Sequence, residues 1–333
     1  MRTAIVSGVT GQDGSYLAEQ LLADGYRVVG IIRRLSFNGS SSRFVNYPGI
    51  SKYLHNLNIE EGDITDAAFI NKIIKTYRPD EYYNLAAMSY VKYSFDNPVS
   101  TMHINADSVA FLIDALEKFS PETKLYQAST SEMFGGIHIT GEDKQSENTP
   151  FVPKSPYGVA KLAAHNFVRL ARERGLFACC GILFNHESER RGAEFVTQKI
   201  CNQIAEIVHD DRVKLDLGNM EARRDWGYAP EYTNGMRRML RHHEPDDYVL
   251  ATGTNHSIRD FVQWCLSHCN MKQKPEDVVD IDPANFRPNE VHYLCGDPSK
   301  AERVLGWLAE TKEQKLADKM MVAALERISR QKG

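Results

Sequence analysis

Near its amino terminus the chain reads Gly8-Val9-Thr10-Gly11-Gln12-Asp13-Gly14. The apolar residues 3–7 before this stretch predict a strand, and the pattern of residues 15–24 after it predicts a helix. Glycines at this spacing allow a tight turn, a close approach of backbone to phosphate, and close packing of helix on strand. The helix N-terminus adds free N–H groups and a partial positive charge. We therefore expect a dinucleotide pyrophosphate to bind here; a plain strand–helix turn is the alternative.

The bulk composition is that of a globular protein. The 333 residues are 42% hydrophobic and 25% charged, and this length suggests two domains or one large domain with a lobe. The net charge of −4 argues against a nucleic-acid partner. No apolar run approaches the ~20 residues of a membrane span, and the first strand begins too early for a signal peptide. We expect a cytoplasmic protein without a membrane partner.

The cysteines predict no disulfide framework. They are Cys179, Cys180, Cys201, Cys265, Cys269 and Cys295, and none forms a Cys-x-x-Cys pair. We expect buried free thiols in a reducing compartment. Cys265, His268 and Cys269 could together hold a metal, but a helix face explains their spacing more simply, so we expect no metal site.

The first half of the chain alternates strands with helices. The expected strands are residues 3–7, 27–32, 81–85 and 124–128, and the expected helices are residues 15–24, 67–77 and 99–119. Such alternation predicts an α/β fold with a Rossmann-like, doubly wound parallel sheet.

The second half predicts a smaller lobe. Residues 155–174 read as an amphipathic helix and residues 176–184 as a buried strand. Beyond residue 185, polar loops and short strands such as 213–217 carry arginines, aromatics and histidines. We expect a C-terminal α/β substrate-binding lobe over the sheet edge. Residues 310–330 read as a charged amphipathic helix with a solvated outer face.

One tyrosine and one lysine lie on the same face of the predicted helix. Tyr157 and Lys161 are four residues apart, and a lysine ammonium lowers the pKa of a nearby tyrosine. A phenolate can then take a hydroxyl proton while hydride leaves the same carbon. Residues 129–132 (Ser-Thr-Ser-Glu) follow the strand 124–128, at the edge where open α/β sheets bind ligands.

Longer motifs accompany this pair. They are residues 127–135 (Gln-Ala-Ser-Thr-Ser-Glu-Met-Phe-Gly), 155–158 (Ser-Pro-Tyr-Gly), 183–188 (Leu-Phe-Asn-His-Glu-Ser), 224–229 (Arg-Asp-Trp-Gly-Tyr-Ala) and 286–291 (Phe-Arg-Pro-Asn-Glu-Val). The chain thereby resembles the extended short-chain dehydrogenase/reductase family. Within it, the motifs resemble the signature of the GDP-mannose 4,6-dehydratases, over nearly the whole length.

The resemblance implies a dehydration with internal redox. Tyr157 would remove the proton of the C4 hydroxyl as hydride leaves C4, and Thr130 would hydrogen-bond the C4 oxygen. Glu132 would remove the C5 proton, the C6 hydroxyl would leave as water with Ser131 assisting, and hydride would return to C6. Lys161 completes the expected catalytic set. A carboxylate beside the tyrosine favours a dehydratase; the alternative for Glu132 is a surface carboxylate closing a loop.

The end of the second predicted strand indicates which dinucleotide binds. Arg33 and Arg34 stand there without a carboxylate, and arginine suits the 2′-phosphate of NADP; two solvated arginines are the alternative. With the residues that the resemblance implies, the expected cofactor site is Gly8, Thr10, Gly11, Gln12, Asp13, Gly14, Arg33, Arg34, Asp63, Ile64, Leu85, Ala86, Ala87, Ser89, Tyr157, Lys161, His186 and Arg191. Two positions depart from the family pattern: Ser100, where relatives often carry tyrosine, and Met88, where many carry glutamine.

The resemblance also implies a site for a GDP-sugar. The expected substrate-binding residues are Ser89, Asn185, Glu187, Lys199, Arg224, Arg287 and Glu290. Arg224 and Arg287 suit the diphosphate because guanidinium binds phosphate oxygens in pairs; for Arg224 the alternative is an ion pair with Asp225. We thus expect an NADP-binding domain of residues 1–185, with returning segments near 220–255, and a lobe of residues 186–333 that mainly binds substrate.

Other functions remain open on the sequence. The substrate could be another GDP-sugar, such as a GDP-manno-heptose; the enzyme could be a nucleotide-sugar epimerase or 4-keto reductase; or the chain could be a non-catalytic nucleotide sensor. We also expect a homodimer formed through the helices 99–119 and 155–174, or a homotetramer if the loop 33–43 reaches a neighbouring subunit. The apolar side chains available for this contact are Val159, Ala160, Leu162, Ala163, Phe167, Phe111, Leu112 and Leu116.

Overall fold

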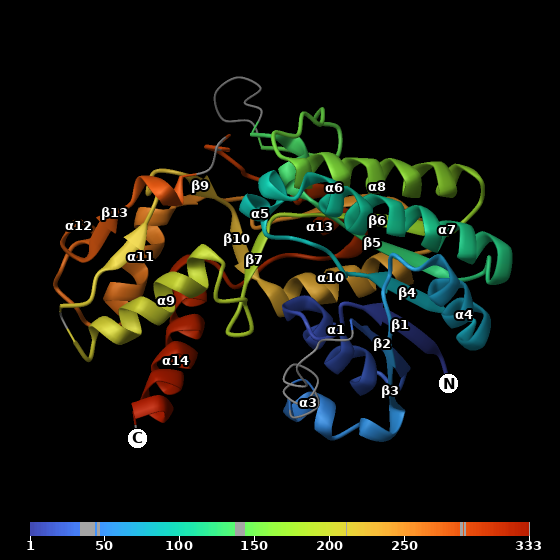
Figure 1. Ribbon diagram of the computed structural model, residues 1–333, viewed down its shortest axis with the longest axis horizontal. Coiled ribbons are helices and arrows are strands. Elements are labelled where there is room, and N and C mark those ends of the chain that lie inside the picture. Colours follow the sequence, from blue (N-terminus) through green and yellow to red (C-terminus); the bar gives the residue numbers. More distant parts are fainter. Residues whose placement is uncertain are drawn as a thin grey trace.

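The computed structural model describes residues 1–33, 44, 47–136, 144–210, 212–286, 289 and 291–332. Figure 1 shows a larger lobe built around a sheet and a smaller lobe beside it, with the C-terminal helix in the smaller lobe. The sheet has seven strands, in the order β11-β6-β5-β4-β1-β2-β3. They are β1 (Thr3–Ser7), β2 (Arg27–Ile32), β3 (Leu57–Glu61), β4 (Glu81–Asn84), β5 (Lys124–Thr130), β6 (Ala178–Leu183) and β11 (Asp247–Leu250).

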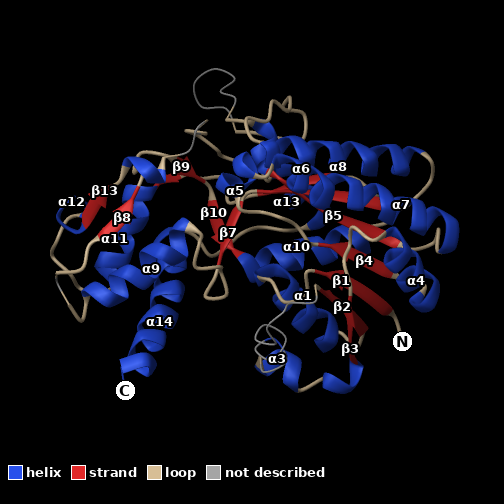
Figure 2. Cartoon of the chain, viewed as in Figure 1, coloured by secondary structure: helices blue, strands red, loops and turns tan. Residues whose placement is uncertain are grey.

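Every neighbouring pair in this sheet is parallel. The chain runs outward from β1 to β3 and then crosses back to β4 on the other side of β1. Helices cover both faces, as Figure 2 shows. The predicted doubly wound parallel sheet is confirmed, and its switch point lies between β1 and β4.

Successive side chains of a strand point to opposite faces of the sheet, so the sheet has a separate apolar core on each face. Ala4 and Val6 of β1 join the core beneath α1 and α10, whereas Ile5 joins the core beneath α4, α7 and α8. The helices concerned are α1 (Gln12–Ala23), α10 (Ala229–Arg241), α4 (Ala67–Tyr77), α7 (Ser108–Phe119) and α8 (Pro156–Glu173). Because each face of the sheet has its own apolar core, the register of the strands is strongly constrained.

The helix predicted over residues 99–119 is interrupted. It consists of α6 (Pro98–Met102), a π-helical turn (His103–Asp107) and α7. The π turn presents Asn105, whose side chain accepts from Met88 N at 2.9 Å and donates to Met88 O at 3.1 Å. The backbone after β4 is thus held independently of the side chain at position 88. Ser100, the other departure from the family pattern, lies in α6.

Several strand ends differ from the expectation. The strand expected over residues 176–184 spans Ala178–Leu183, and the one expected over residues 213–217 spans Leu215–Leu217. β4 ends one residue earlier, and β5 runs on to Thr130 because Ser129 and Thr130 pair with Ile182 and Leu183 of β6. The polar end of β5 is therefore part of the sheet and not a loop.

The smaller lobe has its own apolar core. Its helices are α9 (Val196–Ile207), α11 (Ile258–His268), α12 (Pro275–Val278) and α14 (Glu313–Lys332). Its short strands are β7 (Asn185–Glu187), β8 (Leu215–Leu217), β9 (Arg223–Arg224), β10 (Trp226–Tyr228), β12 (His256–Ser257) and β13 (Val279–Ile281). The core brings α9, α11 and α14 together. Two further helices are α5 (Val91–Asp96) and α13 (Ser299–Leu305).

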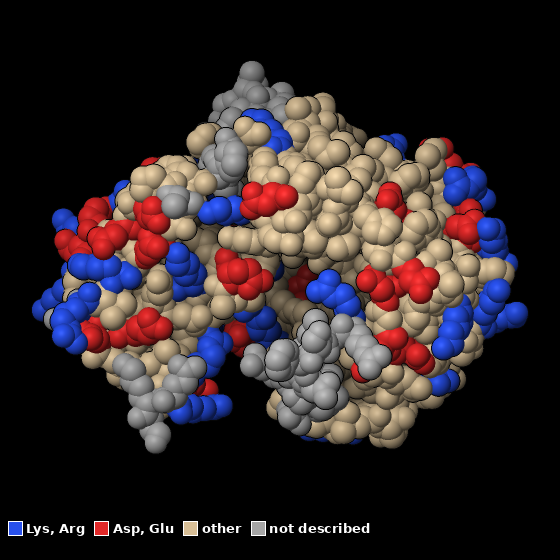
Figure 3. Space-filling model, viewed as in Figure 1, with Lys and Arg blue, Asp and Glu red and all other residues tan. Residues whose placement is uncertain are grey.

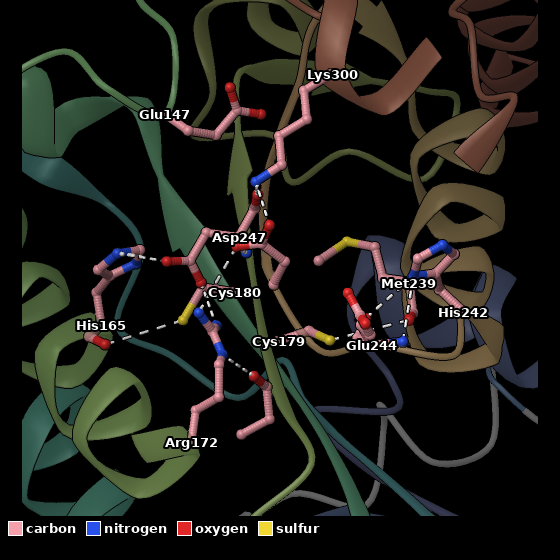
Figure 4. A network of polar contacts seen from close by, with 12 residues as sticks. Glu147, His165, Arg172, Cys179, Cys180, Met239, His242, Glu244, Asp247 and Lys300 are labelled. Carbon is pink, nitrogen blue, oxygen red and sulfur yellow. Dashed lines mark hydrogen bonds and ion pairs between the residues drawn. The ribbon is translucent and has the colours of Figure 1, made fainter. Parts of the chain in front are cut away.

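The edge strand β11 is fixed by a buried polar network (Figure 4). Asp247 forms an ion pair with Arg172 of α8, and His165 Nε2 lies 3.5 Å from Asp247 Oδ2. Arg172 Nε also donates to Ala178 O at 2.6 Å. His165, Cys180 and Asp247 lie close enough to hold a metal ion, but the guanidinium already supplies the positive charge at that carboxylate. We interpret the network as structural.

All six cysteines are free thiols, and five of them are buried. None of the helices that the structure describes is long and apolar enough to cross a membrane.

The C-terminal helix is more deeply packed than its charged sequence suggests. α14 begins at Glu313, three residues later than expected, and buries one face in the core of the smaller lobe. The buried side chains are Leu316, Ala317, Met320, Met321, Ala324 and Ile328. Only the opposite face, which carries Val322, is exposed.

We therefore predict that Leu316→Ala destabilises the protein. Leu316 is fully buried, and a Leu-to-Ala change at such a site costs about 2–5 kcal/mol in the free energy of unfolding. Val322→Ala, on the face that is 49% exposed at this residue, is the matched control and should change it by less than about 0.5 kcal/mol. Urea unfolding of both variants measures the difference. Equal losses would contradict the packing of α14.

Candidate active site

A cleft of about 1030 Å³ opens between the two lobes, at the carboxyl ends of the parallel strands. Figure 3 shows a hollow there, with basic and acidic side chains around its opening. The cleft brings together all the expected catalytic residues and all the expected cofactor and substrate residues that the structure describes. Arg34, Arg287 and Glu290 lie outside the described residues. Ser100 is not among the described residues that line the cleft.

The glycine-rich turn is shaped by close backbone contacts. Gly8 has φ +71°, and a Cβ at Gly14 would lie 2.3 Å from Gly8 O. A Cβ at Gly8 would lie 2.9 Å from Ala86 N of the loop after β4. Gly11 N donates to Gly8 O at 3.0 Å, and Gly11 precedes α1 without a side-chain cap. The first N–H groups of α1 therefore lie at the cleft, where they can donate hydrogen bonds to an anion.

The end of β5 carries the expected proton-transfer groups. Thr130 Oγ1 accepts from Glu132 N at 3.2 Å, and a 3₁₀ turn (Ser131–Phe134) follows. The side chains of residues 130–132 line the cleft although each residue is at most 9% exposed. A carboxylate and two hydroxyls therefore lie together at the cleft with little exposure to solvent.

Tyr157 begins α8 beside this turn. Ser155 caps the helix by accepting from Gly158 N at 3.1 Å, and Tyr157 N donates to Ser94 Oγ at 3.3 Å. Burial raises the pKa of the Tyr157 phenol well above its usual value, although a hydrogen bond with Thr130 opposes this.

Lys161 lies one helical turn further on, with its Nζ 5.9 Å from the centre of the Tyr157 ring. It donates to Ala128 O at 2.9 Å, and burial lowers its pKa to about 8. The expectation that the lysine lowers the pKa of Tyr157 is therefore wrong for the protein alone. Desolvation dominates at both side chains and favours their neutral forms.

At the far end of the cleft, Arg33 follows β2 and is exposed, and Asp63 follows β3. Asp63 Oδ1 accepts from Thr65 N at 2.9 Å and from Thr65 Oγ1 at 2.7 Å. The backbone hydrogen bond from Thr65, with a smaller contribution from the Arg33 charge, holds the pKa of Asp63 below its usual value. This end therefore offers a cation and an ionised carboxylate near each other.

The smaller lobe supplies the other wall. β7 pairs in parallel with β10, so Asn185 faces Trp226 and Glu187 faces Tyr228. Glu187 is only 2% exposed, and it accepts from Thr197 Oγ1 at 2.5 Å and lies 3.1 Å from Arg191 Nε. Glu187 is thus engaged by protein groups, although it lines the cleft.

The basic residues expected for substrate also reach this wall. Lys199 donates to Asp216 O, and Arg224 lies in β9 and donates to Arg223 O at 3.0 Å. Asp225 accepts from Thr252 N, Gly253 N and Gly296 N at 2.8–3.2 Å, and burial raises its pKa to about 6. Asp225 therefore anchors the strand that carries Arg224.

Sequence reasoning missed Arg190, which also lines the cleft. Its guanidinium lies 3.9 Å from the ring centre of Tyr16 and 3.8 Å from that of Tyr47, and its NH2 donates to Glu19 at 2.9 Å. The pair Arg190-Arg191 after β7 was the available signal. Arg190 thereby links the loop after β7 to α1. Further cleft residues that we did not expect are Tyr90, Val91, Lys92, Tyr93, Gly192, Glu194, Phe195, Asp216, Asn219 and Asn285.

Solved structures share this fold. One is dTDP-glucose 4,6-dehydratase from Bacillus anthracis in complex with NAD, with a TM-score of 0.83, 17% identity, and 99% of this chain and 98% of that chain covered. Another is UDP-glucose 4-epimerase from Thermus thermophilus, with a TM-score of 0.82, 21% identity, and coverages of 97% and 98%. The fold is therefore that of the Rossmann-type short-chain dehydrogenases/reductases.

Sequence comparisons identify one family within this class. The family model described as GDP-mannose 4,6 dehydratase matches residues 5–320. The GDP-mannose 4,6-dehydratase of Vibrio cholerae is 41% identical, over 98% of this chain and 94% of its own length. GDP-mannose 4,6 dehydratase 2 of Arabidopsis thaliana is 43% identical, over 99% of this chain and 89% of its own length. The chain belongs to the GDP-mannose 4,6-dehydratase family. The predicted resemblance is confirmed, and an epimerase, reductase or sensor is not favoured.

Proposed function

We propose that this chain converts GDP-mannose to GDP-4-keto-6-deoxymannose, with NADP as a cofactor that is regenerated in each turnover. The observation that carries the proposal is the position of Glu132, which lines the same cleft as Thr130, Tyr157 and the glycine-rich turn. Oxidation at a sugar carbon needs one base, the phenol, besides the hydride-accepting cofactor, whereas removal of the C5 proton needs a further base. Family membership supports the same reaction.

The cleft fits a nicotinamide dinucleotide. Its pyrophosphate would lie in the glycine-rich turn, at the N-terminus of α1, which has no side-chain cap. The turn is so tight that a Cβ at Gly14 would collide with Gly8 O. When bound, such a cofactor accepts a hydride from C4 and returns it to C6. Arg33 supports the choice of NADP because its guanidinium suits a 2′-phosphate.

The chain's own groups divide the proton transfers. Tyr157 takes the proton of the C4 hydroxyl, with Thr130 holding the C4 oxygen. Glu132 takes the C5 proton and returns a proton to the C6 hydroxyl, which leaves as water with Ser131 assisting. Lys161 is held in place by its hydrogen bond to Ala128 O. It is the basic residue of α8 nearest to Tyr157 in the sequence.

The other wall suits the nucleotide sugar. Arg224 and Lys199 supply positive charge for its diphosphate, and Asn185 and Ser89 supply polar contacts. The division of labour between the lobes follows from this: residues 1–185 with the segments near 220–255 bind cofactor, and the rest of 186–333 mainly binds substrate. α10, which packs on the sheet, and β11, which is an edge strand of it, support that boundary. The six free thiols suit a reducing, cytoplasmic location.

We predict that Tyr157→Phe and Glu132→Gln both cripple turnover, at different steps. Each change should cost roughly 10²–10⁴ in rate, the usual contribution of general acid–base catalysis. Tyr157→Phe should abolish the transient reduction of the cofactor, whereas Glu132→Gln should retain it and block loss of water. Cofactor absorbance after mixing with GDP-mannose, and product mass, measure the two steps.

The exposed Glu173→Gln at the end of α8 is the control for Glu132→Gln and should behave as wild type. Exchange of the C5 proton with deuterated water at the wild-type rate in Glu132→Gln would contradict the assignment of Glu132.

We predict that Arg33→Ala reduces the preference for NADP over NAD. The variant loses a charge-assisted contact with the 2′-phosphate, on the order of 1.5–3 kcal/mol. Calorimetric titration with both dinucleotides measures the ratio of dissociation constants. Lys52→Ala, at an exposed lysine that is not among the described residues lining the cleft, is the control. An unchanged ratio in Arg33→Ala would leave Arg33 a solvated residue and make Arg34 the next to test.

We also propose that a second copy covers the outer face of α6, α7 and α8. Val159 and Phe167 are 46% and 40% exposed there, and Val99 and Leu170 are 81% and 50% exposed. Ala160, Leu112 and Leu116, which were also expected to contribute, are buried against the chain's own sheet. An apolar surface of this kind marks an interface.

Light scattering tests this. We predict a mass of two or four times the 37.7 kDa chain, and a lower mass for the double variant Phe167→Asp, Leu170→Asp. A wild-type monomer at micromolar concentration would contradict the proposal.

A further inference from the structure

A carboxylate lies inside the phosphate-binding turn. Asp13 is the second residue of α1, and it lines the cleft among the glycines. Its negative charge favours the helix N-terminus, but it also repels any phosphate that approaches the same N–H groups. If the turn binds a diphosphate, as our proposed function requires, the charge of Asp13 has to be neutralised.

His186 of β7 meets this carboxylate. Its Nε2 lies 2.8 Å from Asp13 Oδ2, and its Nδ1 lies 2.7 Å from Phe184 O. A backbone carbonyl and an ionised carboxylate both accept hydrogen bonds and cannot donate them. Each ring nitrogen therefore has to donate, and only the doubly protonated imidazolium carries two N–H groups.

The proton between the two side chains belongs to the histidine. Burial raises the pKa of Asp13, but the charge and hydrogen bond of His186 outweigh it and hold that pKa below its usual value. Burial lowers the pKa of His186, but the charge of Asp13 outweighs it and raises that pKa above its usual value. Gln12 Nε2 donates to Asp13 Oδ1 at 3.1 Å, which also favours the ionised carboxylate.

Other ionisable groups face the pair from four elements. Arg191, after β7, lowers the pKa of both partners, and it is itself paired with Glu187. Tyr232 of α10 stacks on the imidazole, with ring centres 4.6 Å apart and an angle of 16°. β10 places Gly227, which has no side chain, opposite His186.

Two further tyrosines, Tyr126 of β5 and Tyr157 of α8, interact electrostatically with Asp13. Burial raises the pKa of each, as it does for Tyr232, so all three are neutral. The charged groups then form two balanced pairs, Asp13 with His186 and Arg191 with Glu187.

The ion pair is part of a larger connection between the lobes. Gln12 Nε2 donates to His186 O at 3.0 Å, and Ser188 Oγ donates to Gln12 Oε1 at 2.8 Å. These contacts join the first turn of α1 to β7, and β7 pairs with β10 next to Arg224. The turn expected to hold the cofactor and the strands expected to hold the sugar nucleotide therefore meet at His186.

We propose that His186 is a positioning residue whose imidazolium neutralises Asp13 and clamps the phosphate-binding turn to β7, so that one proton controls how tightly the turn holds a diphosphate. The proposal rests on the proposed function, because the diphosphate is that of the cofactor. The pair is intact below the raised pKa of His186. As the pH rises through that pKa, the proton leaves, the clamp loosens, and the Asp13 carboxylate faces the phosphates alone.

Histidine NMR tests the ion pair without any cofactor. The protein is labelled at histidine Cε1 and stripped of nucleotide, and His186→Gln identifies the resonance of His186. We expect this resonance to titrate above the range of unperturbed histidines in wild type, and to move to lower pH in Asp13→Asn. Titration of wild-type His186 at or below the value of an unperturbed histidine would overturn the proposal.

Calorimetric titration with NADP tests the consequence. From about pH 6 to about pH 9, which spans imidazole titration in proteins, the wild-type dissociation constant should rise on the order of tenfold, the size of one charge-assisted contact. His186→Gln should bind weakly at every pH. Asp13→Asn should bind with a flat profile, because it has no carboxylate to neutralise.

His268→Gln is the matched control, because His268 also pairs with a carboxylate, Asp318 at 2.9 Å, between α11 and α14; it should follow the wild-type profile. A pH-independent wild-type constant would overturn the clamp. If no variant, the control included, bound NADP or NAD, the proposed cofactor would be wrong, and the NMR titration would still decide whether the ion pair exists.

Discussion

Seven strands run in the same direction, so every loop that leaves a carboxyl end does so at one edge of the sheet. The order of the strands reverses between β1 and β4, and the loops after these two strands separate there. Where the two loops begin, however, they are in close contact, because a Cβ at Gly8 would lie 2.9 Å from Ala86 N. The glycine-rich turn, the end of β5 and the strand after β6 all reach the cleft because of this single topological constraint.

The smaller lobe is attached to that edge by strand pairing and not by a flexible linker. Only Phe184 separates β6 from β7, and its side chain is buried in a core with residues of β6 and β11. β7 then pairs with β10, and the buried Asp225 beside β10 accepts hydrogen bonds from the loop after β11. The residues of β7 and β9 that we propose to bind substrate are thereby held in a fixed relation to the sheet, which precise hydride and proton transfers require.

Much of this arrangement could be predicted from short-range patterns. β1, β2 and α4 have the bounds that their periodicity indicated. β3 was missed because Leu57, Ile59 and the polar residues around them form a half-exposed strand at the edge of the sheet. The π turn at Asn105 was missed because it depends on a contact with Met88, seventeen residues earlier. Arg190 was missed for the same reason: its partners Tyr16, Tyr47 and Glu19 are far away in sequence.

The protonation state of the tyrosine and lysine was the least predictable feature, because burial decides it and sequence spacing does not show burial. Desolvation raises the pKa of Tyr157 and lowers that of Lys161 to about 8, so the pair avoids holding a phenolate in an apolar site. Ala128 O nevertheless keeps the lysine at the end of β5, within one helical turn of the phenol. The protein thus fixes the positions of the two groups, while burial favours the neutral form of each.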